Sequence, residues 1–409
     1  MATSQSRHAL AFIFVTVLLD SIGFGIIMPV MPTLIVELVG GDLSGASIYG
    51  GWLMFVFAAM QFLFAPTLGN LSDRFGRRPV ILFALATLGL DYFVMALAPS
   101  IAWLFAGRAI AGIAGASFTP AYAYVADVTP AESRGRAFGL IGAAFGAGFI
   151  LGPAIGGLLG AFGPRAPFYA AAAITLANLA YGWFVLPESL PAGSRRPFEW
   201  RRANPAGTLL QMRKHPEVLA LLAAIFVWNV AGQVYPSTWA FYTMHKFGWS
   251  EAAVGASLAA AGAIIVLSQG FVSRLLFPRL GEARTTVIGL LAGAAGFLGY
   301  AFASEGWMMY AWLLTWLLGG IVYPGMNALA SHRIEADAQG ELQGAVASSF
   351  GLSSIVGPPL MTQLFGWFSA PDAPLFFPGA AFACAAVLAV VTLPFMKGAL
   401  RAETQRGKS

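Results

Sequence analysis

Twelve apolar runs of about 20 residues or more divide this 409-residue chain. A helix needs about 20 apolar residues to cross the hydrocarbon core of a bilayer, so each run is long enough to span a membrane. The runs lie near residues 9–36, 45–68, 79–98, 100–124, 137–162, 166–187, 217–243, 252–273, 285–304, 307–331, 342–368 and 374–396. Only 10% of the residues are charged, whereas soluble domains are about 25% charged. We therefore predict an all-α membrane protein with 12 transmembrane helices.

Positive charges orient the predicted spans. The first run begins within eight residues of Met1 and has no small-residue cleavage site behind it, so it is a retained span and not a signal peptide. Of the 23 Lys and Arg residues, Arg165 and Lys246 fall in loops of one face, Arg108 lies within a span, and the others lie at the termini or in loops of the opposite face. Cytoplasmic loops carry an excess of Lys and Arg, which places both termini in the cytoplasm. The net charge of +5 reflects topology, and no nucleic-acid partner is expected.

A polar stretch separates two similar halves. We predict an N-terminal six-helix bundle over residues 1–187, a cytoplasmic linker over 188–214 and a C-terminal six-helix bundle over 215–409. The halves match at a fixed offset of 205 residues, so that Gly76, for example, corresponds to Gly281. Parallel repeats of this kind build transporters with a central site between two bundles.

A dense charged motif follows the second run. Its members fit the pattern G-x3-D-R-x-G-R-R and are Gly69, Asp73, Arg74, Gly76, Arg77 and Arg78. Three arginines so close together cannot lie in hydrocarbon, so the motif predicts a tight loop over 69–80 in which glycines permit the turn. The pattern resembles the signature loop between helices 2 and 3 of the major facilitator superfamily, which implies that superfamily's two-bundle fold.

Two interpretations of the charged motif stay open. It is either a positive anchor with no moving part or a gate that holds the outward-open state. In a gate, Asp73 would cap the helix that begins near Gly340, because unpaired N–H groups and the helix dipole favour an anion there. Arg77 would pair with Asp127 at the end of the fourth span.

The fifth run carries a second motif, G-x3-G-P-x2-G-G. Its members are Gly148, Gly152, Pro153, Gly156 and Gly157. Glycines at four-residue spacing clear one helix face for close packing, and the proline removes a backbone hydrogen bond. A packing role alone is one interpretation. The pattern also resembles the antiporter motif of drug exporters in the superfamily, which implies export.

Three charged residues lie inside predicted spans, apart from Glu217 at the very start of the seventh. Asp20 and Asp91 are mid-span, and Arg108 lies near the start of the fourth run. A charge at the bilayer centre costs roughly 2.5–3.5 kcal/mol and persists only when it is paired, neutralised or facing water. Such acids suit cyclic uptake and release of protons, although structural hydrogen bonds, or an Arg108 that reaches the interface, are the alternatives. The surrounding G-R-x3-G-x2-G resembles the superfamily's helix 4 motif, which implies proton transfer for Arg108.

Polar side chains inside the spans are the candidate substrate contacts, since hydrocarbon penalises unpaired polar groups. They are Gln61, Asn229, Gln233, Tyr235, Asn327 and Gln343. Trp228, Trp239 and Phe241 cluster around Pro236 in the seventh run and either stack on a flat substrate or form an interfacial belt. No pair among the four histidines has metal-ligand spacing, so no metal site is predicted.

Within the superfamily, the chain resembles the tetracycline exporters over nearly its whole length. The segments that carry this resemblance include LDSIGFGIIMPVMP at 19–32, QFLFAP at 61–66, LDY at 90–92, FGW at 247–249 and LQG at 342–344. The resemblance implies roles in coupling, gating or substrate contact for Asp20, Gln61, Asp73, Asp91 and Gln233. Those exporters carry a further acid in helix 9 and often a histidine in helix 8, but the aligned positions near Gly293 and Ile265 carry neither. This departure leaves the proton stoichiometry, and tetracycline itself, open.

We therefore predict a proton-coupled antiporter of the bacterial inner membrane that exports tetracycline or a related hydrophobic, drug-like molecule by alternating access. Its partners would be the small-molecule substrate, protons and the lipid bilayer, and it would act as a monomer. The proton gradient would supply the energy without a cofactor, and the substrate would arrive free or as a metal chelate. One alternative is a transporter of an endogenous metabolite on the same scaffold. A membrane enzyme is disfavoured because the embedded acids are scattered mid-span, and ATP hydrolysis because no G-x4-G-K-[ST] loop occurs.

Overall fold

The computed structural model describes residues 4–115, 118–130, 133–199, 216–335 and 338–406. Within these ranges the regular secondary structure is helical and includes no strand, as predicted. The chain divides into two compact units, each described separately below. Unit 1 comprises Met1–Gly40, Val56–Pro205 and Ser250–Ala259, and unit 2 comprises Gly41–Phe55, Ala206–Trp249 and Ala260–Ser409.

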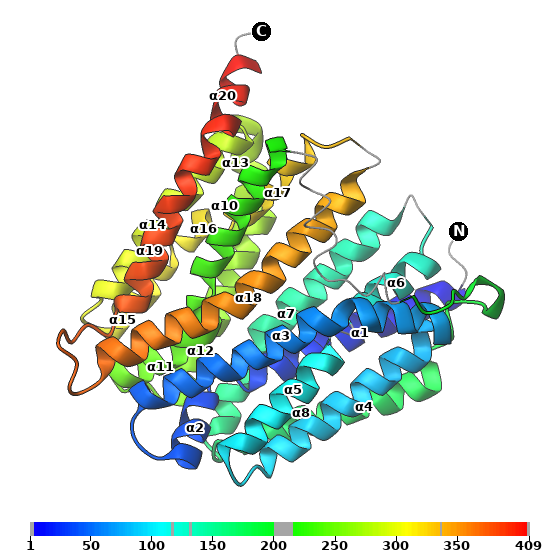
Figure 1. The fold of residues 1–409 in the computed structure, drawn as a ribbon, viewed down its shortest axis with the longest axis horizontal. Helices are drawn as coiled ribbons and strands as arrows, with labels where there is room; N and C mark the ends of the chain where they lie inside the picture. Colours follow the sequence, from blue (N-terminus) through cyan, green and yellow to red (C-terminus); the bar gives the residue numbers. More distant parts are fainter. Residues whose placement is uncertain (1–3, 116–117, 131–132, 200–215, 336–337, 407–409) are drawn as a thin grey trace. The chain divides into compact units, whose positions relative to one another are not determined.

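Unit 1 is built from the helices of the first half of the chain, together with the beginning of α12 (Figure 1). They are α1 (Ser4–Ile26), α2 (Met31–Val39), most of α3 (Leu43–Phe75), α4 (Arg77–Ala96), α5 (Ile101–Gly115), α6 (Phe118–Val128), α7 (Arg134–Gly160), α8 (Ala166–Val185) and the start of α12 (Glu251–Leu267). The beginning of α3 belongs to unit 2, so the units do not follow the predicted boundaries at every residue. The predicted division into a bundle over 1–187, a linker over 188–214 and a bundle over 215–409 stays a prediction. Residues 200–215 lie outside the described part of the chain.

Unit 2 holds the remaining helices. They are α10 (Pro216–Gly232), α11 (Val234–Phe247), the rest of α12, the π-helical turn Ser268–Val272, α13 (Ser273–Leu280), α14 (Glu282–Phe302), α15 (Gly306–Leu313), α16 (Trp316–Gly319), α17 (Val322–Ser331), α18 (Gln339–Ser369), α19 (Ala380–Thr392) and α20 (Lys397–Arg406). The predicted span 307–331 is therefore divided among α15, α16 and α17.

Ten helices in the described ranges are long and apolar enough to cross a membrane. An eleventh is obtained if the bent pair Ala11–Ile26 and Met31–Val39 counts as one span, with a bend of 48° between its parts. Pro29 and Pro32 lack backbone N–H groups, which accounts for the break in the predicted span 9–36. The predicted span 342–368 is also helical, within α18, but its serines and prolines lower its hydropathy, and it is not among the ten.

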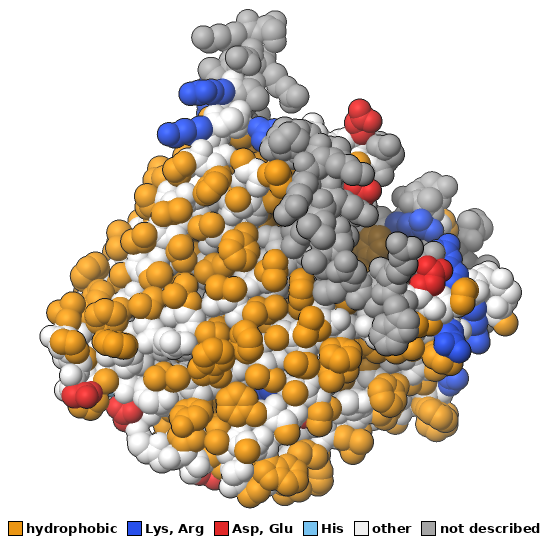
Figure 2. All heavy atoms as spheres, in the orientation of Figure 1, with side chains coloured by type: hydrophobic (Ala, Val, Ile, Leu, Met, Phe, Trp, Pro, Cys, Tyr) orange, Lys and Arg blue, Asp and Glu red, His pale blue; other side chains and the backbone are white. Residues whose placement is uncertain are grey.

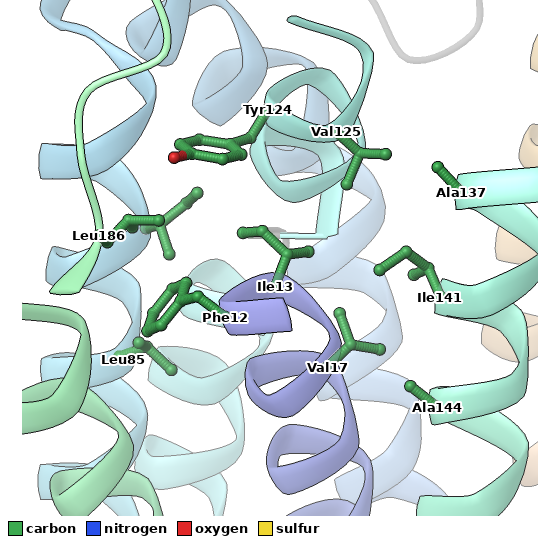
Figure 3. Packing of buried hydrophobic residues seen from close by; sticks show 11 residues of the cluster. Phe12, Ile13, Val17, Leu85, Tyr124, Val125, Ala137, Ile141, Ala144 and Leu186 are labelled. Atoms are coloured by element: carbon green, nitrogen blue, oxygen red, sulfur yellow. The ribbon is translucent and has the colours of Figure 1, made fainter. Parts of the chain in front are cut away.

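The core of unit 1 forms where α1 packs against α4, α6 and α7 (Figure 3). Phe12, Ile13 and Val17 project from α1 into this cluster and are fully or almost fully buried. Tyr124 of α6 and Ile141 of α7 belong to the same cluster. This packing fixes α1, the helix that carries the first membrane acid.

Large apolar side chains also cover the outside of the helices. Phe162 and Phe184 are 82% and 85% exposed. Figure 2 shows hydrophobic side chains along the displayed face, with Lys and Arg gathered near helix ends. Apolar area this continuous drives soluble proteins to aggregate, but it is the ordinary surface of a protein embedded in lipid.

Asp42 caps the beginning of α3. Its carboxylate accepts hydrogen bonds from the Ser44 hydroxyl (2.6 Å) and the Gly45 amide (2.9 Å). These two bonds hold the pKa of Asp42 below the usual carboxyl range. Because the folded-state pKa is lowered, the cap stabilises the protein above the unfolded pKa of Asp, and this contribution is lost as the pH falls through the folded value.

Replacing Asp42 with Ala should lower the free energy of unfolding by about 1 kcal/mol at neutral pH, because α3 loses its cap. Asp42→Asn retains a capping oxygen and should lose much less. Thermal unfolding in detergent at neutral and at acidic pH measures both effects, and the deficit of the Ala variant should shrink in acid. Equal melting temperatures for Ala and Asn variants at neutral pH would contradict the capping role.

Candidate functional site

The charged motif is helical almost throughout. Helix α3 runs to Phe75 and α4 begins at Arg77, so the predicted loop over 69–80 is wrong and only Gly76 separates the two helices. Gly76 has a φ of +105°, and a Cβ there would lie 2.2 Å from a carboxylate oxygen of Glu188. A turn this short requires glycine, for its backbone conformation and for the space it leaves.

Arg77 is the centre of the motif. The side chain is buried, and its Nε lies 3.2 Å from Asp127 Oδ2, which confirms the predicted pair. The same guanidinium donates to the Ser72 hydroxyl (2.7 Å) and to the Asp73 carboxylate, and the Arg77 amide donates to Glu188 (2.9 Å). A buried charge is stable only with partners of this kind, so Arg77 ties α3, α4 and α6 together.

The other motif residues have different surroundings. Gly69 lies inside α3, Arg74 is exposed, and Arg78 donates to a backbone carbonyl at the end of α8 (2.7 Å). The capping contact of Asp73 with the helix near Gly340, and the gating role of the motif, stay predictions.

The segment that follows α8 docks on the charged motif, a contact that the sequence does not predict. The Arg196 amide donates to the Asp73 carbonyl (3.1 Å), and the Asn70 side chain donates to the Glu199 carbonyl (2.7 Å). Glu188, in the same segment, accepts a hydrogen bond from the Arg77 amide. The only signal in the sequence was an acid directly after the sixth span, beside a motif rich in arginine.

Substituting Gly76 with Ala should destabilise unit 1 by about 1–3 kcal/mol, because the backbone conformation is strained for Ala and Glu188 must move. Gly139→Ala is the matched control, since a Cβ there meets nothing within 4 Å. Thermal unfolding of the two purified variants compares them. A Gly76→Ala protein as stable as the control would rule out the close contact with Glu188.

The second motif packs α7 on α1. A Cβ at Gly148, Gly152 or Gly156 would lie 2.8, 2.8 or 1.9 Å, respectively, from a backbone carbonyl oxygen of α1. These carbonyls belong to Leu18, Ile22 and Ile26. The glycine face therefore brings the two backbones together along the stretch of α1 that carries Asp20.

The remaining two motif residues extend this contact. Pro153 packs against Gly25 of α1, where an added Cβ would lie 2.8 Å from the proline ring. Gly157 faces the beginning of α12, and a Cβ on it would lie 2.5 Å from the Glu251 carbonyl and 3.1 Å from Gly255. The geometry explains all five residues by packing, and their part in antiport stays a prediction.

Gly156→Ala should force α7 and α1 apart and lower stability by about 1–3 kcal/mol, the usual result of overpacking. Gly142→Ala, on the same helix where a Cβ meets nothing within 4 Å, is the control and should be neutral. Unfolding midpoints and export rates measured side by side provide the comparison. If the Gly156→Ala protein is as stable and as active as the wild type, α7 and α1 do not pack as closely as the contact distances indicate.

Asp91 and Arg108 form a buried ion pair. Their side chains approach to 3.5 Å, and the residues are only 3% and 5% exposed. Neither carboxylate oxygen of Asp91 has a hydrogen-bond partner among the described residues, and the Arg108 side chain donates to the Met95 sulfur (3.1 Å) and lies over the Phe57 ring. Arg108 is thus held beside an acid instead of reaching the interface. The pair has few supporting partners, which makes it sensitive to the charge of Asp91.

Asp20 lies on α1, and its buried Oδ1 has no hydrogen-bond partner in the part of the chain that the structure describes. Near it, a Cβ at Gly23 would lie 3.4 Å from the hydroxyl of Tyr92, the residue after Asp91. The long Tyr92 side chain therefore reaches from α4 to α1 near both acids. Unit 1 holds the three predicted coupling residues, but the structure pairs only Asp91 with Arg108.

Most of the predicted substrate contacts have partners within the protein. Gln61 donates to a carbonyl at the end of α5 (3.1 Å), and the buried Gln233 donates to a serine of α18 (3.0 Å). Gln343 donates to Asn327 (3.3 Å). These amides stabilise helix contacts in the structure, and their role toward a substrate stays a prediction.

The aromatic residues around Pro236 divide into two groups. Trp239 and Phe241 are 0% and 4% exposed and belong to the core of unit 2, so neither forms an interfacial belt. The Tyr235 hydroxyl interacts with the side chains of Tyr300 and Trp316, whereas the Asn229 amide nitrogen is buried without a hydrogen-bond partner among the described residues. Unsatisfied buried donors are rare in folded proteins, so Asn229 remains a candidate for ligand contact.

The position aligned with the missing helix 9 acid is covered by an aromatic ring. A Cβ at Gly293 would lie 2.6 Å from the Trp228 indole. The indole therefore occupies the space in which an acidic side chain would lie. In the described ranges, no three His, Cys, Asp or Glu side chains lie close enough together to hold a metal ion.

Comparison with known families agrees with this architecture. The model of the family described as "Major Facilitator Superfamily" matches residues 13–347 and 279–408. The chain belongs to the Major Facilitator Superfamily.

Two similar relatives are both tetracycline resistance proteins. The class C protein of Escherichia coli is 41% identical over 393 residues, which cover 96% of this chain and 97% of the relative. The class G protein of Vibrio anguillarum is 42% identical over 350 residues, which cover 85% and 88%.

Solved structures share the fold at low identity. A bacterial homologue of the human lysosomal transporter Spinster, solved in an inward-facing and occupied conformation, matches with a TM-score of 0.80 at 16% identity, covering 98% of each chain. A D-xylose-proton symporter matches with a TM-score of 0.75 at 18% identity, covering 96% of this chain and 98% of its own. These two likenesses establish the transporter fold alone.

Proposed function

We propose that the protein is a proton-coupled antiporter that exports tetracycline or a related drug-like molecule by alternating access. The observation that carries the proposal is the identity of about two residues in five with tetracycline resistance proteins over most of each chain. The membrane acids and the glycine motif of α7 support it, because they are the residues through which the chain resembles proton-driven exporters.

The proton-coupling step centres on Asp91 and Arg108. The attraction between Asp91 and Arg108, 3.5 Å apart, favours the charged carboxylate, whereas the burial of Asp91 opposes the charge. When Asp91 takes up a proton, this attraction is lost and the buried Arg108 needs another partner. Proton uptake is thereby linked to the packing of α4 and α5. Asp20, on the helix that α7 holds, is the second proton carrier.

The proposal extends to the setting of the protein. The excess of positive charge in one set of loops supports cytoplasmic termini, and the relatives support a bacterial inner membrane. The proton gradient supplies the energy, and the substrate travels alone or as a metal chelate. The charged motif around Arg77 acts as the gate, and a monomer carries out transport without catalysis.

Replacing Asp20 with Asn, or Asp91 with Asn, should abolish accumulation of tetracycline against a gradient, with a drop of at least about tenfold in proton-driven rate. The assay uses the full chain in vesicles that contain a pH dye and follows drug and protons together. Glu37→Gln is the matched control, because Glu37 pairs with Arg165 (2.9 Å) away from the embedded acids.

Wild-type vesicles should show drug and protons moving in opposite directions. Drug movement with no accompanying pH change would refute proton coupling. Wild-type rates of proton-driven export in Asp20→Asn would remove that residue from the mechanism while leaving antiport intact.

A further inference from the structure

A line of polar residues on one face of α1 meets α8. Thr16, Asp20 and Gly23 are spaced by four and three residues, so they share one face of the helix. The Thr16 hydroxyl donates a hydrogen bond to the side-chain oxygen of Asn178 on α8 (3.3 Å). At the other end of the line, a Cβ at Gly23 would lie 3.7 Å from the Thr175 hydroxyl of the same helix. Asp20 lies between these two contacts, on the face that α1 presents to α8.

Gly23 leaves a space lined by two hydroxyl groups. A Cβ there would lie 3.4 Å from the Tyr92 hydroxyl of α4 and 3.7 Å from the Thr175 hydroxyl, which are ordinary contact distances. The face of α1 that meets α7 is different, because a Cβ at Gly25 would lie only 2.8 Å from the Pro153 ring. Close packing therefore explains Gly25 but not Gly23, where the space accepts one methyl group.

Polar atoms along this contact lack partners. In the described part of the chain, Asp20 Oδ1, the Thr175 hydroxyl and the Asn178 amide nitrogen are buried without hydrogen-bond partners. Thr175 and Asn178 are each only 1% exposed. The Tyr92 hydroxyl lies close enough to Asp20 to interact with its charge. Unsatisfied buried polar atoms are rare in folded proteins, so three of them along one helix contact indicate a small polar ligand.

The size and the chemistry of the space fit one water molecule. A buried water makes about three hydrogen bonds to otherwise unsatisfied groups, and here a carboxylate and two hydroxyls are available. Water can donate to the Asp20 carboxylate, which only accepts, and can accept from the hydroxyls of Tyr92 and Thr175. A bulkier ligand would not fit in a space of one methyl group, and an anion would be repelled by the carboxylate.

We propose that Gly23, Tyr92 and Thr175 form a buried water site beside Asp20, and that the bound water stabilises the ionised form of this acid within the membrane. The proposal rests on the proposed role of Asp20 as a proton carrier and adds three positioning residues to it. A hydrogen bond to a carboxylate favours its charged form, so the water helps to set the pH at which Asp20 releases its proton. Without the water, the carboxyl group would hold its proton more tightly.

Few other charges face this part of α1. Within Ala166–Val185, helix α8 carries no Asp, Glu, Lys, Arg or His, and α7 carries only Arg134 and Arg136, in its first turn. The acid of α6, Asp127, lies at the charged motif. Beyond that motif, α4 and α5 contribute the Asp91–Arg108 ion pair. All these groups are retained in the variants below, so a change in the titration of the α1 acid reports the water site.

The test follows the protonation of Asp20 by infrared spectroscopy, with the purified full chain reconstituted in vesicles. The carboxylic acid band that is lost in Asp20→Asn reports this group, and its intensity is measured against pH. In Gly23→Ala a methyl group takes the place of the water, so the midpoint pH should rise by about one unit, a tenfold gain in proton affinity. Thr175→Val lacks the hydroxyl and should raise the midpoint in the same way. Thr175→Ser keeps the hydroxyl and should retain the wild-type midpoint.

Thermal stability separates this role from a purely structural one. Alanine has a higher helix propensity than glycine, and an added Cβ at Gly23 makes no close contact, so the melting temperature of Gly23→Ala should be unchanged or raised. Gly142→Ala on α7 is the matched control, because a Cβ there meets nothing within 4 Å. The control should leave the midpoint pH of Asp20 unchanged.

Three results would overturn the inference. The first is a wild-type midpoint in either Gly23→Ala or Thr175→Val. The second is an equal rise in Thr175→Ser and Thr175→Val, since the hydroxyl would then have no part in the effect. The third is a Gly23→Ala protein that melts below the wild type, since the space would then not exist.

Drug transport distinguishes this inference from the proposed function. If the midpoint does not move in the variants while the wild type exchanges tetracycline for protons, the water site is refuted and antiport stands. If the midpoint rises as expected but the wild type exchanges no drug for protons, the proposed function alone is contradicted.

Discussion

The fit between the glycine face of α7 and the backbone of α1 is the contact on which unit 1 depends. In lipid, helices gain little from burying apolar side chains against each other, so close backbone approach replaces the hydrophobic effect as the source of packing energy. Here the approach is so close that carbonyl oxygens of α1 occupy the space of the missing Cβ atoms. Because this stretch of α1 contains Asp20, the same contact that stabilises the unit also fixes a membrane acid.

The two buried arginines of unit 1 show how partners determine what a charge can do. Arg77 has two carboxylates and a hydroxyl around its guanidinium, so its charge is compensated several times over. Arg108 has one carboxylate at 3.5 Å and otherwise a sulfur atom and a ring. The first arrangement suits a fixed joint between helices. The second leaves Arg108 dependent on Asp91, whose negative charge is removed when it binds one proton.

The sequence was sufficient for the features that depend on lipid. Long apolar runs, charge asymmetry and glycine spacing predicted an all-helical membrane protein, and the pairing of Arg77 with Asp127 followed from the motif. The sequence was insufficient where contacts between distant segments determine the local structure. A charged motif usually indicates a loop, but α3 continues through it because the segment after α8 supplies partners for its polar groups. Nor does the sequence reveal that Trp228 lies on Gly293, since that contact joins helices far apart in the chain.

The docked segment after α8 changes how the connection between the two halves should be viewed. Hydrogen bonds from Asn70 to the Glu199 carbonyl and from Arg196 to the Asp73 carbonyl fasten it to the first unit. The described part of the predicted linker, from Glu188 to Glu199, is therefore a packed part of the first unit, and that unit extends well beyond the end of α8.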